Sequence, residues 1–550
     1  MLPLWSFPGG IHPPMHKEES TQSPIVKLPM PKRLVLSLHQ HIGAPNIPDV
    51  EIGEKVLKGQ RIAHADGYVS VALHAPTSGT ITDIGKYPVP HPSGLSDLCI
   101  VLTSDGKDEW GTKEAADDYL NMDASHLRNR VREAGIVGLG GAGFPSFIKL
   151  NPGPHKVVDT LLINGIECEP YISCDDMLMR ERNSDIVAGI KIIAHAVEAK
   201  QSIIAVEDNK PEAYQAMLDA TANEPDISVI QCPTIYPQGS EKQLIYVVTG
   251  KEVPSNGLPL NVGIVVHNVG TAAAIYNAIT KAEPLISRIV TVTGDAIAKP
   301  QNLEVLIGTP IHVLLDFCEA QSNIDQLIMG GPMMGFAIHS SLASVLKTSN
   351  CILATTYDEL PQKKMEMPCI RCGVCADVCP IKLLPQQLYW HAKAKDFEKT
   401  QDYNLFDCIE CGCCAYVCPS NIPLVHYYRF AKTEIWSIER EQKKADIARQ
   451  RHDFRAERLA KEKAEKAARH KRKRNELKEK SDEKNKESKL KSSEKPKKKA
   501  AILEAMERVQ LKKEANKTEP KNTTDLTEEQ QEKINQIDKQ RESQKNNANH

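Results

Sequence analysis

CIRCGVCADVCP at residues 369–380 and CIECGCCAYVCP at residues 408–419 are two short runs with the same cysteine spacing. Both follow the pattern C-x2-C-x2-C-x3-C-P, which binds 4Fe–4S clusters in bacterial iron–sulfur proteins. Where two such runs occur together, the fourth cysteine of each run binds the cluster of the other. We therefore assign one cluster to Cys369, Cys372, Cys375 and Cys418, and a second to Cys408, Cys411, Cys414 and Cys379.

Structural zinc and disulfides are the alternative roles for these thiols. Structural zinc sites are usually built from separated C-x2-C pairs, not from four cysteines followed by a proline. Disulfides need an oxidising compartment, and residues 1–10 lack the basic and long apolar segments of an export signal. Cys413 is a spare thiol in the second run, because it falls outside the spacing that the other four cysteines share with the first run.

Length and composition predict a multidomain protein of a reducing cytoplasm. The 550 residues are enough for about three or four domains. Six of the 15 cysteines are scattered outside the two runs, as is usual where thiols stay reduced. Residues 440–550 contain 34 Lys and Arg against 22 Asp and Glu, so an acidic body carries a basic tail. No uninterrupted apolar stretch of about 18 residues occurs, so we expect no membrane span.

The first 125 residues divide into an extended arm and a β-rich module. Residues 1–30 are rich in proline and glycine, so we expect an arm without regular helix or strand that wraps around the body. Residues 31–125 contain short strand-like runs and turns, with GEKVLKGQ at 53–60 and APTSG at 75–79. These turns resemble those of a barrel-sandwich hybrid of the biotinyl/lipoyl type. That family can carry a modified lysine at a hairpin tip, but this tip is missing here, so we expect a docking module.

GLGGAGFPSFIK at residues 138–149 is the second informative stretch. Clustered glycines allow the backbone to approach a ligand closely, and free N–H groups before a helix can bind phosphate. Residues 127–135, which precede the loop, indicate a helix and not a strand, so the usual dinucleotide fingerprint is not present. An ordinary tight turn explains the glycines equally well when they are considered alone.

This loop resembles the flavin-binding loop of the NADH-oxidising FMN subunit of respiratory complex I. Three further pieces follow in the same order: LLINGIECEP at 161–170, YPQGSEKQL at 236–244 and HNVGT at 267–271. Two departures, Ser240 for an acidic residue and Leu139 for a basic one, leave the nucleotide contacts open. The resemblance implies that the phosphate side of FMN is held by Gly138, Gly140, Gly141, Gly143 and Lys149, and that the ring and nucleotide side is lined by Asn164, Glu167, Glu169, Gly239, Glu241, Asn268 and Thr271. For each acidic residue, a solvated or helix-capping carboxylate is the alternative.

The remaining segments complete a multidomain fold that combines α/β and α+β modules. Apolar strands and helices alternate over residues 126–285, which indicates an α/β domain that binds FMN and NAD. Residues 286–350 become β-rich and resemble the small β-grasp (SLBB) module that follows the flavin domain in complex I. Residues 351–436 form a ferredoxin-like stretch around the cysteine runs. The Lys/Glu-rich tail, 437–550, predicts a solvated helix that frays into disorder, with contact to anionic lipid or an acidic partner as the alternative.

In this order, the modules resemble the C subunits of Rnf/Rsx-type ion-translocating electron transport complexes, over residues 1–435. The resemblance implies a peripheral subunit on the cytoplasmic side of the bacterial inner membrane, held there by the other subunits. As part of a translocase, it would pass electrons between NAD(H) and these partners through FMN and two 4Fe–4S clusters. Nucleic acid is not an expected partner, because aromatic residues do not alternate with the basic ones in the tail. The coupling ion, the direction of electron flow and the final acceptor do not follow from the sequence.

Two other functions fit the same residues. The chain could be a soluble NADH- or ferredoxin-dependent oxidoreductase, which fractionation away from the membrane would indicate. It could also be a two-cluster relay or scaffold protein that lacks its own nucleotide site. Purified protein with intact clusters but without flavin would indicate the relay.

Overall fold

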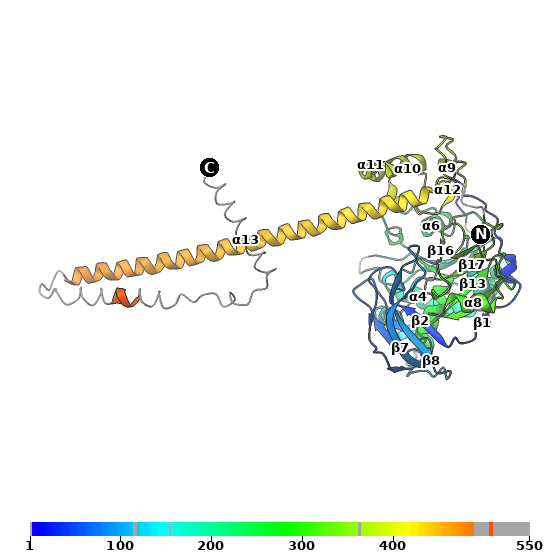
Figure 1. The fold of residues 1–550 in the computed structure, drawn as a ribbon, viewed down its shortest axis with the longest axis horizontal. Coiled ribbons are helices and arrows are strands. Elements are labelled where there is room, and N and C mark those ends of the chain that lie inside the picture. Colours follow the sequence, from blue (N-terminus) through cyan, green and yellow to red (C-terminus); the bar gives the residue numbers. More distant parts are fainter. Residues whose placement is uncertain (1–2, 114–117, 154–155, 361–364, 489–504, 510–550) are drawn as a thin grey trace, which may run out of the picture. The chain divides into compact units, whose positions relative to one another are not determined.

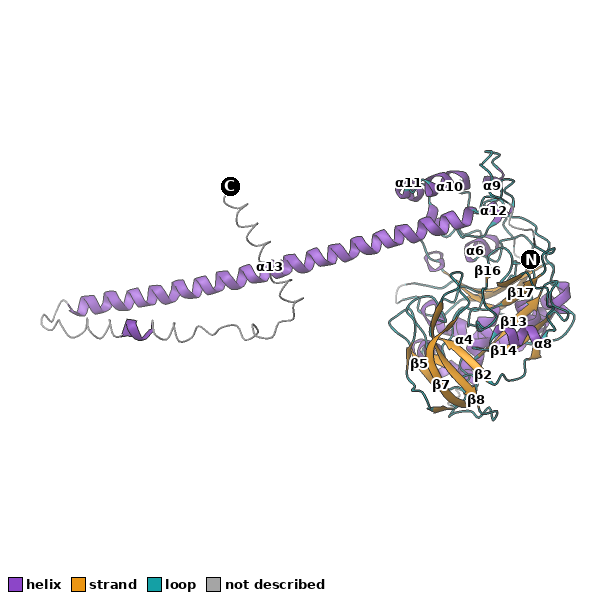
Figure 2. Ribbon diagram, viewed as in Figure 1, coloured by secondary structure: helices purple, strands orange, loops and turns teal. Residues whose placement is uncertain are grey.

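The computed structural model describes residues 3–113, 118–153, 156–360, 365–488 and 505–509 (Figure 1). The chain divides into two units, Met1–Arg440 and Glu441–His550. Figure 2 shows that the first unit combines strands and helices, as the multidomain α/β and α+β prediction requires. The described part of the second unit is helical.

The barrel module consists of two antiparallel sheets, and strands β2, β7 and β8 of the larger sheet are drawn in blue in Figure 1. Leu34, Leu36 and Ile81 are fully buried between the sheets. Gly79 is required where β7 begins, because a Cβ atom there would lie 2.1 Å from the Thr103 carbonyl oxygen. The predicted barrel sandwich is confirmed. Its sheets are β2 (Arg33–Ser37), β8 (Ser96–Ser104), β7 (Gly79–Pro88) and β4 (Lys55–Val56), and β3 (Ile47–Pro48), β5 (Arg61–His64) and β6 (Leu73–His74).

A parallel sheet with the strand order β11-β10-β9-β12 forms the centre of the α/β domain. Asn268 at the end of β12 lies opposite Asn164 in β9, where the strand order reverses. Ligands of open α/β sheets bind at such a point, outside the carboxyl ends of the strands. The elements are α1 (Ala124–Glu133), α2 (Ser146–Lys149), β9 (Thr160–Gly165), α3 (Cys174–Glu181), α4 (Asn183–Val197), β10 (Gln201–Glu207), α5 (Pro211–Thr221), β11 (Ile227–Cys232), α6 (Glu241–Thr249), β12 (Ile264–Asn268) and α7 (Val269–Thr280).

The third module is a six-stranded sheet with the order β1-β14-β13-β17-β15-β16 and one helix. Its edge strand β1 (Val26–Lys27) comes from the arm, so the expectation that residues 1–30 contain no strand is wrong: this segment pairs with β14. The sheet also continues past residue 350, because β17 hydrogen-bonds with β13 and β15. The other elements are β13 (Ser287–Thr293), β14 (Gln301–Leu306), α8 (Ile311–Phe317), β15 (Gln326–Met329), β16 (Phe336–Ala337) and β17 (Cys351–Thr355).

Lys347 joins three of these modules in a buried position. Its Nζ atom donates to the carbonyl oxygens of Ala72 in the barrel module (2.8 Å) and Gly135 after α1 (2.7 Å). Burial lowers the pKa of Lys347 to about 7. The two carbonyl dipoles therefore replace the water that this side chain loses.

The ferredoxin-like segment is mostly loops and short helices, and a helix follows each Cys-Pro pair. The last helix, α13, starts at Leu424 and continues into the second unit, where every side chain described from residue 441 to residue 481 is exposed. Most of the tail after residue 488 lies outside the described residues. In the part of the chain that the structure describes, no helix is long and apolar enough to cross a membrane. The helices are α9 (Val374–Asp377), α10 (Pro385–Lys393), α11 (Phe397–Asp402), α12 (Cys413–Tyr416) and α13 (Leu424–Ser488).

Candidate functional site

A cavity of about 460 Å³ lies at the carboxyl ends of β9 and β12. This volume is in the usual range of small-molecule sites. The walls come from the glycine loop, the connection from β9 to α3, the loop before α6 and the start of α7, together with the β-module loop 330–335 and the second cysteine run. The predicted site residues that line it are Gly140, Gly141, Asn164, Glu167, Glu169, Gly239 and Asn268.

The glycine loop lines this cavity with residues whose backbone N–H groups are open. Gly140, Gly141 and Ala142 are part of its wall, and their N–H groups donate to no acceptor among the described residues. Gly141 has a φ of +106°, in the region that side chains rarely adopt. Successive free N–H groups of this kind form a concave site for an anion such as a phosphate.

Three predicted residues support the loop without lining the cavity. The Gly138 N–H donates to the Phe144 carbonyl (2.8 Å) and closes the turn. Gly143 continues the turn with a φ of +63°. The Thr271 hydroxyl oxygen accepts a hydrogen bond from the Leu139 N–H (2.9 Å), which fixes the loop to the start of α7. These residues position the open N–H groups.

Asn164 and Asn268 hold the two strand ends at the cavity. The Asn164 Nδ2 atom donates to the Gly239 carbonyl (2.8 Å), so the loop before α6 is attached to β9. Asn268 caps α7, since its Oδ1 atom accepts from the Gly270 N–H (2.9 Å). Its Nδ2 atom donates to the Asp175 carboxylate (2.6 Å). The two asparagines thus connect β9 with the loop before α6, and the start of α7 with the start of α3.

Lys149 and Glu241 lie side by side, away from the cavity lining. The Lys149 ammonium forms an ion pair with the Glu241 carboxylate and donates to the Val266 carbonyl (3.1 Å). The structure therefore brings together two predicted residues, but neither of them lines the cavity. The expected contact of Lys149 with a phosphate stays a prediction.

Glu167 and Glu169 follow β9, and backbone N–H groups hold both side chains. Glu167 caps α3, because its Oε1 atom accepts from the Asp175 N–H (2.9 Å). The Glu169 Oε1 atom accepts from the N–H groups of Met333 (2.7 Å) and Met334 (3.0 Å), which fastens the β-module loop to the cavity. Burial raises the pKa of the Glu169 carboxyl.

Three residues with important contacts here were not among the predicted site residues. Lys17 of the arm is buried, and its Nζ atom donates to the carbonyls of Glu167 (2.7 Å) and Glu169 (2.9 Å). Asp175 and Tyr236 both line the cavity. Tyr236 opens one of the quoted motifs and could have been found there, whereas a single lysine in a proline-rich arm carries no local pattern.

The two cysteine runs have the same backbone conformation. Arg371 and Glu410, at equivalent positions, both have a φ of +58°, and Gly373 and Gly412 have φ values of +86° and +83°. Each glycine precedes a single helical turn, α9 or α12. The sequence duplication is therefore a structural duplication.

The eight predicted cluster ligands form two groups, each around one hollow. Each group contains three cysteines of one run and the fourth cysteine of the other, in the pairing that the spacing predicts. Cys413 also borders the second hollow, although its position in the run is that of Val374. We call the group Cys369, Cys372, Cys375 and Cys418 the outer site, and the group Cys379, Cys408, Cys411 and Cys414 the inner site.

The inner site is buried next to the cavity, whereas the outer site is open. Three of the four inner thiols are only 7–9% exposed, but Cys372 of the outer site is exposed to solvent. Ile409 and Cys411 line the cavity itself. The Tyr236 hydroxyl, which also lines it, donates to the Cys411 carbonyl (2.6 Å). A molecule in the cavity would therefore lie against the inner site.

The N-terminal arm covers the inner site. The Gly10 N–H donates to the Val378 carbonyl (3.0 Å), one residue before Cys379. Ile11 packs in a buried cluster with Tyr236 and Cys411. The arm therefore contacts the inner site through these residues and the cavity loops through Lys17.

The donor sets fit the groups that the sequence resemblance implies. Open N–H groups suit the phosphate of FMN, and four thiols around each hollow match the ligand set of a 4Fe–4S cluster. Two larger hollows of about 690 and 1170 Å³ lie elsewhere in the first unit and contain none of the predicted residues. The candidate site is therefore the smaller cavity with the two cysteine groups.

Models of three protein families match this chain. Residues 5–107 match the RnfC barrel sandwich hybrid domain, residues 131–277 the Nuo51 FMN-binding domain, and residues 368–422 a 4Fe-4S dicluster domain. The chain thus contains an FMN-binding domain and a 4Fe–4S dicluster domain, as predicted from the sequence. Among solved structures, an NAD⁺-reducing NiFe hydrogenase in the H2-reduced state matches with a TM-score of 0.41 and a sequence identity of 18%. The match covers 56% of this chain and 62% of the hydrogenase chain, and we base no conclusion on it.

Curated relatives match over most of this chain. A Pseudomonas aeruginosa protein is 49% identical over 85% of this chain and 60% of its own length. A Yersinia pestis bv. Antiqua protein is 46% identical over 85% of this chain and 75% of its own length. A Vibrio cholerae O1 protein is 47% identical over 85% of this chain and 60% of its own length. Each relative is named as the C subunit of an ion-translocating oxidoreductase complex.

The chain spans about 60% of the length of the Pseudomonas and Vibrio relatives. The identity and coverage to the Yersinia protein establish common family membership. The chain therefore belongs to the family of the C subunits of ion-translocating oxidoreductase complexes.

Proposed function

We propose that this chain is the peripheral subunit of a membrane-bound, ion-translocating complex on the cytoplasmic side of the bacterial inner membrane. It passes electrons between NAD(H) and partner subunits through FMN and two 4Fe–4S clusters. The names of the relatives support the complex and its ion translocation. The side of the membrane and the partner subunits follow from the family resemblance alone.

One observation carries the proposal. The cavity that holds the open N–H groups of Gly140 and Gly141 is also lined by Cys411 of the inner site. A two-electron carrier and a one-electron carrier would then lie close together, which favours electron transfer between NAD(H) and the clusters. FMN, when bound, supplies the exchange between pairs of electrons and single electrons.

The residues of the cavity have different roles in binding FMN. Gly140, Gly141 and Ala142 provide N–H donors for the phosphate. Asn164 holds the loop before α6 at the cavity, Asn268 holds the start of α3 there, and Glu169 fastens the loop 330–335 to the cavity. This loop and the arm keep bulk water away from the inner site.

The eight cysteines would bind the clusters in the crossed arrangement. The inner site receives electrons beside the cavity, and the outer site exchanges them with a partner because Cys372 is exposed. Crossed ligands hold the two clusters close together, which favours fast transfer between them. The route runs from NAD(H) to the cavity, the inner site, the outer site and the partner, or in reverse.

Anaerobic purification with flavin and iron counted per chain tests this proposal. We expect one FMN and about eight irons per chain, and bleaching of the flavin by NADH. Protein with about eight irons but no flavin would contradict the proposal and indicate the relay protein instead.

A pair of glycine variants makes the test specific to the cavity. Gly141→Ala places a methyl group at a φ of +106° in the loop that offers the N–H donors. Gly67→Ala is the matched control, because Gly67 has a φ of +80° and a Cβ atom there would meet nothing within 4 Å. Both changes strain the backbone by roughly 1 kcal/mol, but only Gly141→Ala should lower the flavin content.

A further inference from the structure

We propose that Asp175 takes up and releases the proton that accompanies electron transfer between the flavin cavity and the inner site. This inference rests on the proposed function, since it requires FMN in the cavity. It adds a proton-handling residue that neither the sequence motifs nor the glycine loop indicates.

Asp175 is the second residue of α3 and faces the cavity. Its neighbours Cys174 and Asp176 are buried, but Asp175 keeps part of its surface open and lines the cavity wall. The Oδ2 atom accepts the hydrogen bond from Asn268 Nδ2 (2.6 Å). Among the described residues, hydrogen bonds engage this oxygen alone, so Oδ1 remains for a proton.

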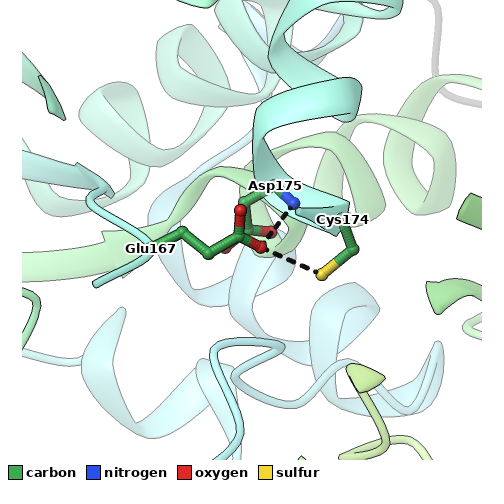
Figure 3. A group of neighbouring side chains, drawn as sticks. All are labelled: Glu167, Cys174 and Asp175. Atoms are coloured by element: carbon green, nitrogen blue, oxygen red, sulfur yellow. Dashed lines mark hydrogen bonds between the residues drawn. The ribbon is translucent and has the colours of Figure 1, made fainter. Parts of the chain in front are cut away.

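Glu167 sets a negative charge beside this carboxyl. Figure 3 shows the Glu167 carboxylate accepting from the Asp175 N–H (2.9 Å) and from the Cys174 thiol (3.3 Å). One ligand-type atom from each of these three residues lies within 4.8 Å of the others. Two carboxylates this close resist ionising together. Both Glu167 oxygens accept backbone N–H groups of α3, whereas Asp175 Oδ1 has no partner among the described residues, so we place the proton of the pair on Asp175.

The groups around Asp175 explain the pKa of its carboxyl. Burial and the charge of Glu167 raise its pKa to about 7. The hydrogen bond from Asn268 and the charges of Arg288 on β13 and Lys210 before α5 act in the opposite direction. The balance leaves a carboxyl that can bind or lose a proton at neutral pH, as a proton carrier must.

The neighbouring acidic groups are less suited to this task. Glu167 has both carboxylate oxygens engaged by the N–H groups of α3. The Glu169 Oε1 atom accepts two backbone N–H groups of the β-module loop. The Cys174 thiol is fully buried and has a pKa well above its ordinary value, because of burial and the nearby carboxylates. Glu169 is also partly exposed, but its carboxylate fastens the β-module loop, whereas Asp175 keeps one carboxylate oxygen without a partner among the described residues.

The proton balance requires such a group. A hydride from NADH carries two electrons and one proton into the flavin cavity. Two one-electron acceptors remove the two electrons, so one N–H bond of the cofactor must break and one proton must leave. In this proposal an O–H bond forms at Asp175 Oδ1, and the proton then passes to water in the cavity. In the opposite direction Asp175 returns the proton.

Stopped-flow reduction of the anaerobic holoprotein by NADH separates the two halves of the reaction. Hydride arrival bleaches the flavin and needs no proton acceptor, so Asp175→Asn should slow this step far less than it slows reduction of the clusters. Reduction of the clusters needs the proton to leave, so it should slow by about 100-fold at pH 7, within the range of general acid–base effects. Asp175→Glu should restore most of the second rate.

A matched variant and a second measurement exclude a general structural effect. Asp185→Asn makes the same change at the start of α4, outside the cavity, and should alter neither rate. In flavin-free protein with ¹³C-labelled aspartate carboxyls, the NMR signal that Asp175→Asn removes should titrate near neutral pH. Glu167→Gln should move this titration to lower pH, because it removes the neighbouring charge.

The possible outcomes distinguish a failure of the Asp175 role from a failure of the proposed function. Flavin that is bound and bleached by NADH, with clusters reduced at the parent rate in Asp175→Asn, would overturn the role of Asp175 and leave the proposed function intact. An Asp175 signal that titrates near its ordinary pH in the flavin-free protein would also overturn it. Parent protein that binds no flavin would overturn the proposed function and this inference with it.

Discussion

The inner and outer sites share one backbone conformation but have different surroundings. Equivalent residues of the two runs adopt nearly the same positive φ values, and each run ends in the same single helical turn. Around the inner site, however, the arm, Tyr236 and the cavity loops exclude solvent, whereas Cys372 of the outer site is exposed.

This difference shows how a duplicated motif acquires two roles. The spacing of the cysteines determines which atoms are bound, but the neighbouring elements determine what each cluster can reach. Burial and hydrogen bonds around the sulfur atoms also tune cluster potentials. In our account the inner site exchanges electrons with the cavity, and the outer site exchanges them with a partner.

The crossed pairing gives the largest expected effect. Cys379→Ala should deplete the same cluster as Cys408→Ala, although Cys379 belongs to the other run, and either variant should lower iron from about eight to about four per chain. Iron analysis and EPR of the reduced protein would measure this loss. Cys413→Ala is the control within the second run and should keep all the iron. Depletion of the outer cluster by Cys379→Ala would contradict the crossed pairing.

The difference in burial predicts a difference in reactivity. A soluble oxidant such as ferricyanide should destroy the outer cluster about tenfold faster than the inner one, because the surrounding shell limits access to a metal site. Time-resolved EPR would follow both signals. Equal rates would show that the arm and Tyr236 do not protect the inner site.

The arm itself can be tested by a single methyl group. At Gly9, whose φ is +68°, a Cβ atom would lie 2.6 Å from the Val378 carbonyl oxygen, so Gly9→Ala should lift the arm and speed loss of the inner cluster several-fold. The matched control is Gly53→Ala, with a φ of +92° and nothing within 4 Å of the new Cβ atom. Unchanged protection in Gly9→Ala would argue against a covering role for the arm.

Tyr236 gives a smaller and more selective effect. Tyr236→Phe removes the hydroxyl that donates to the Cys411 carbonyl, so the reduced inner cluster loses a favourable dipole. A hydrogen bond of about 1 kcal/mol corresponds to at most about 40 mV for one electron. Redox titration followed by EPR should show a lower potential for the inner cluster alone. An equal shift at the outer cluster would contradict the local explanation.

The last prediction concerns stability and the acidic wall of the cavity. The folded chain raises the pKa of Asp175 above its ordinary value, so its stabilising contribution is present at low pH and is lost as the pH rises towards and through 7. Asn cannot ionise, so Asp175→Asn should gain stability relative to the parent between pH 5 and pH 8, by on the order of 2 kcal/mol. Thermal unfolding of flavin-free protein at both pH values would measure this change, and a constant difference would contradict it.

Local sequence patterns predicted the modules and the cysteine pairing because each depends on short-range spacing. The glycine loop was found for the same reason, whereas Asn268 was found through the family resemblance as a cavity residue, and its role as the cap of α7 was not predicted. Lys17, Asp175 and the Glu169 contact with Met333 were not found, because each brings together segments far apart in the chain. The arm strand β1 was missed for a similar reason, since only pairing with β14 defines it.

The order of the two sites along the electron path is the central claim, and freeze-quench EPR after addition of NADH tests it most directly. Cys372→Ala removes an outer ligand, so our account predicts that NADH still reduces the inner cluster at the parent rate. Cys411→Ala removes an inner ligand, and the outer cluster should then stay oxidised on the same timescale while the flavin is bleached. Reduction of the outer cluster at the parent rate in Cys411→Ala would contradict the account.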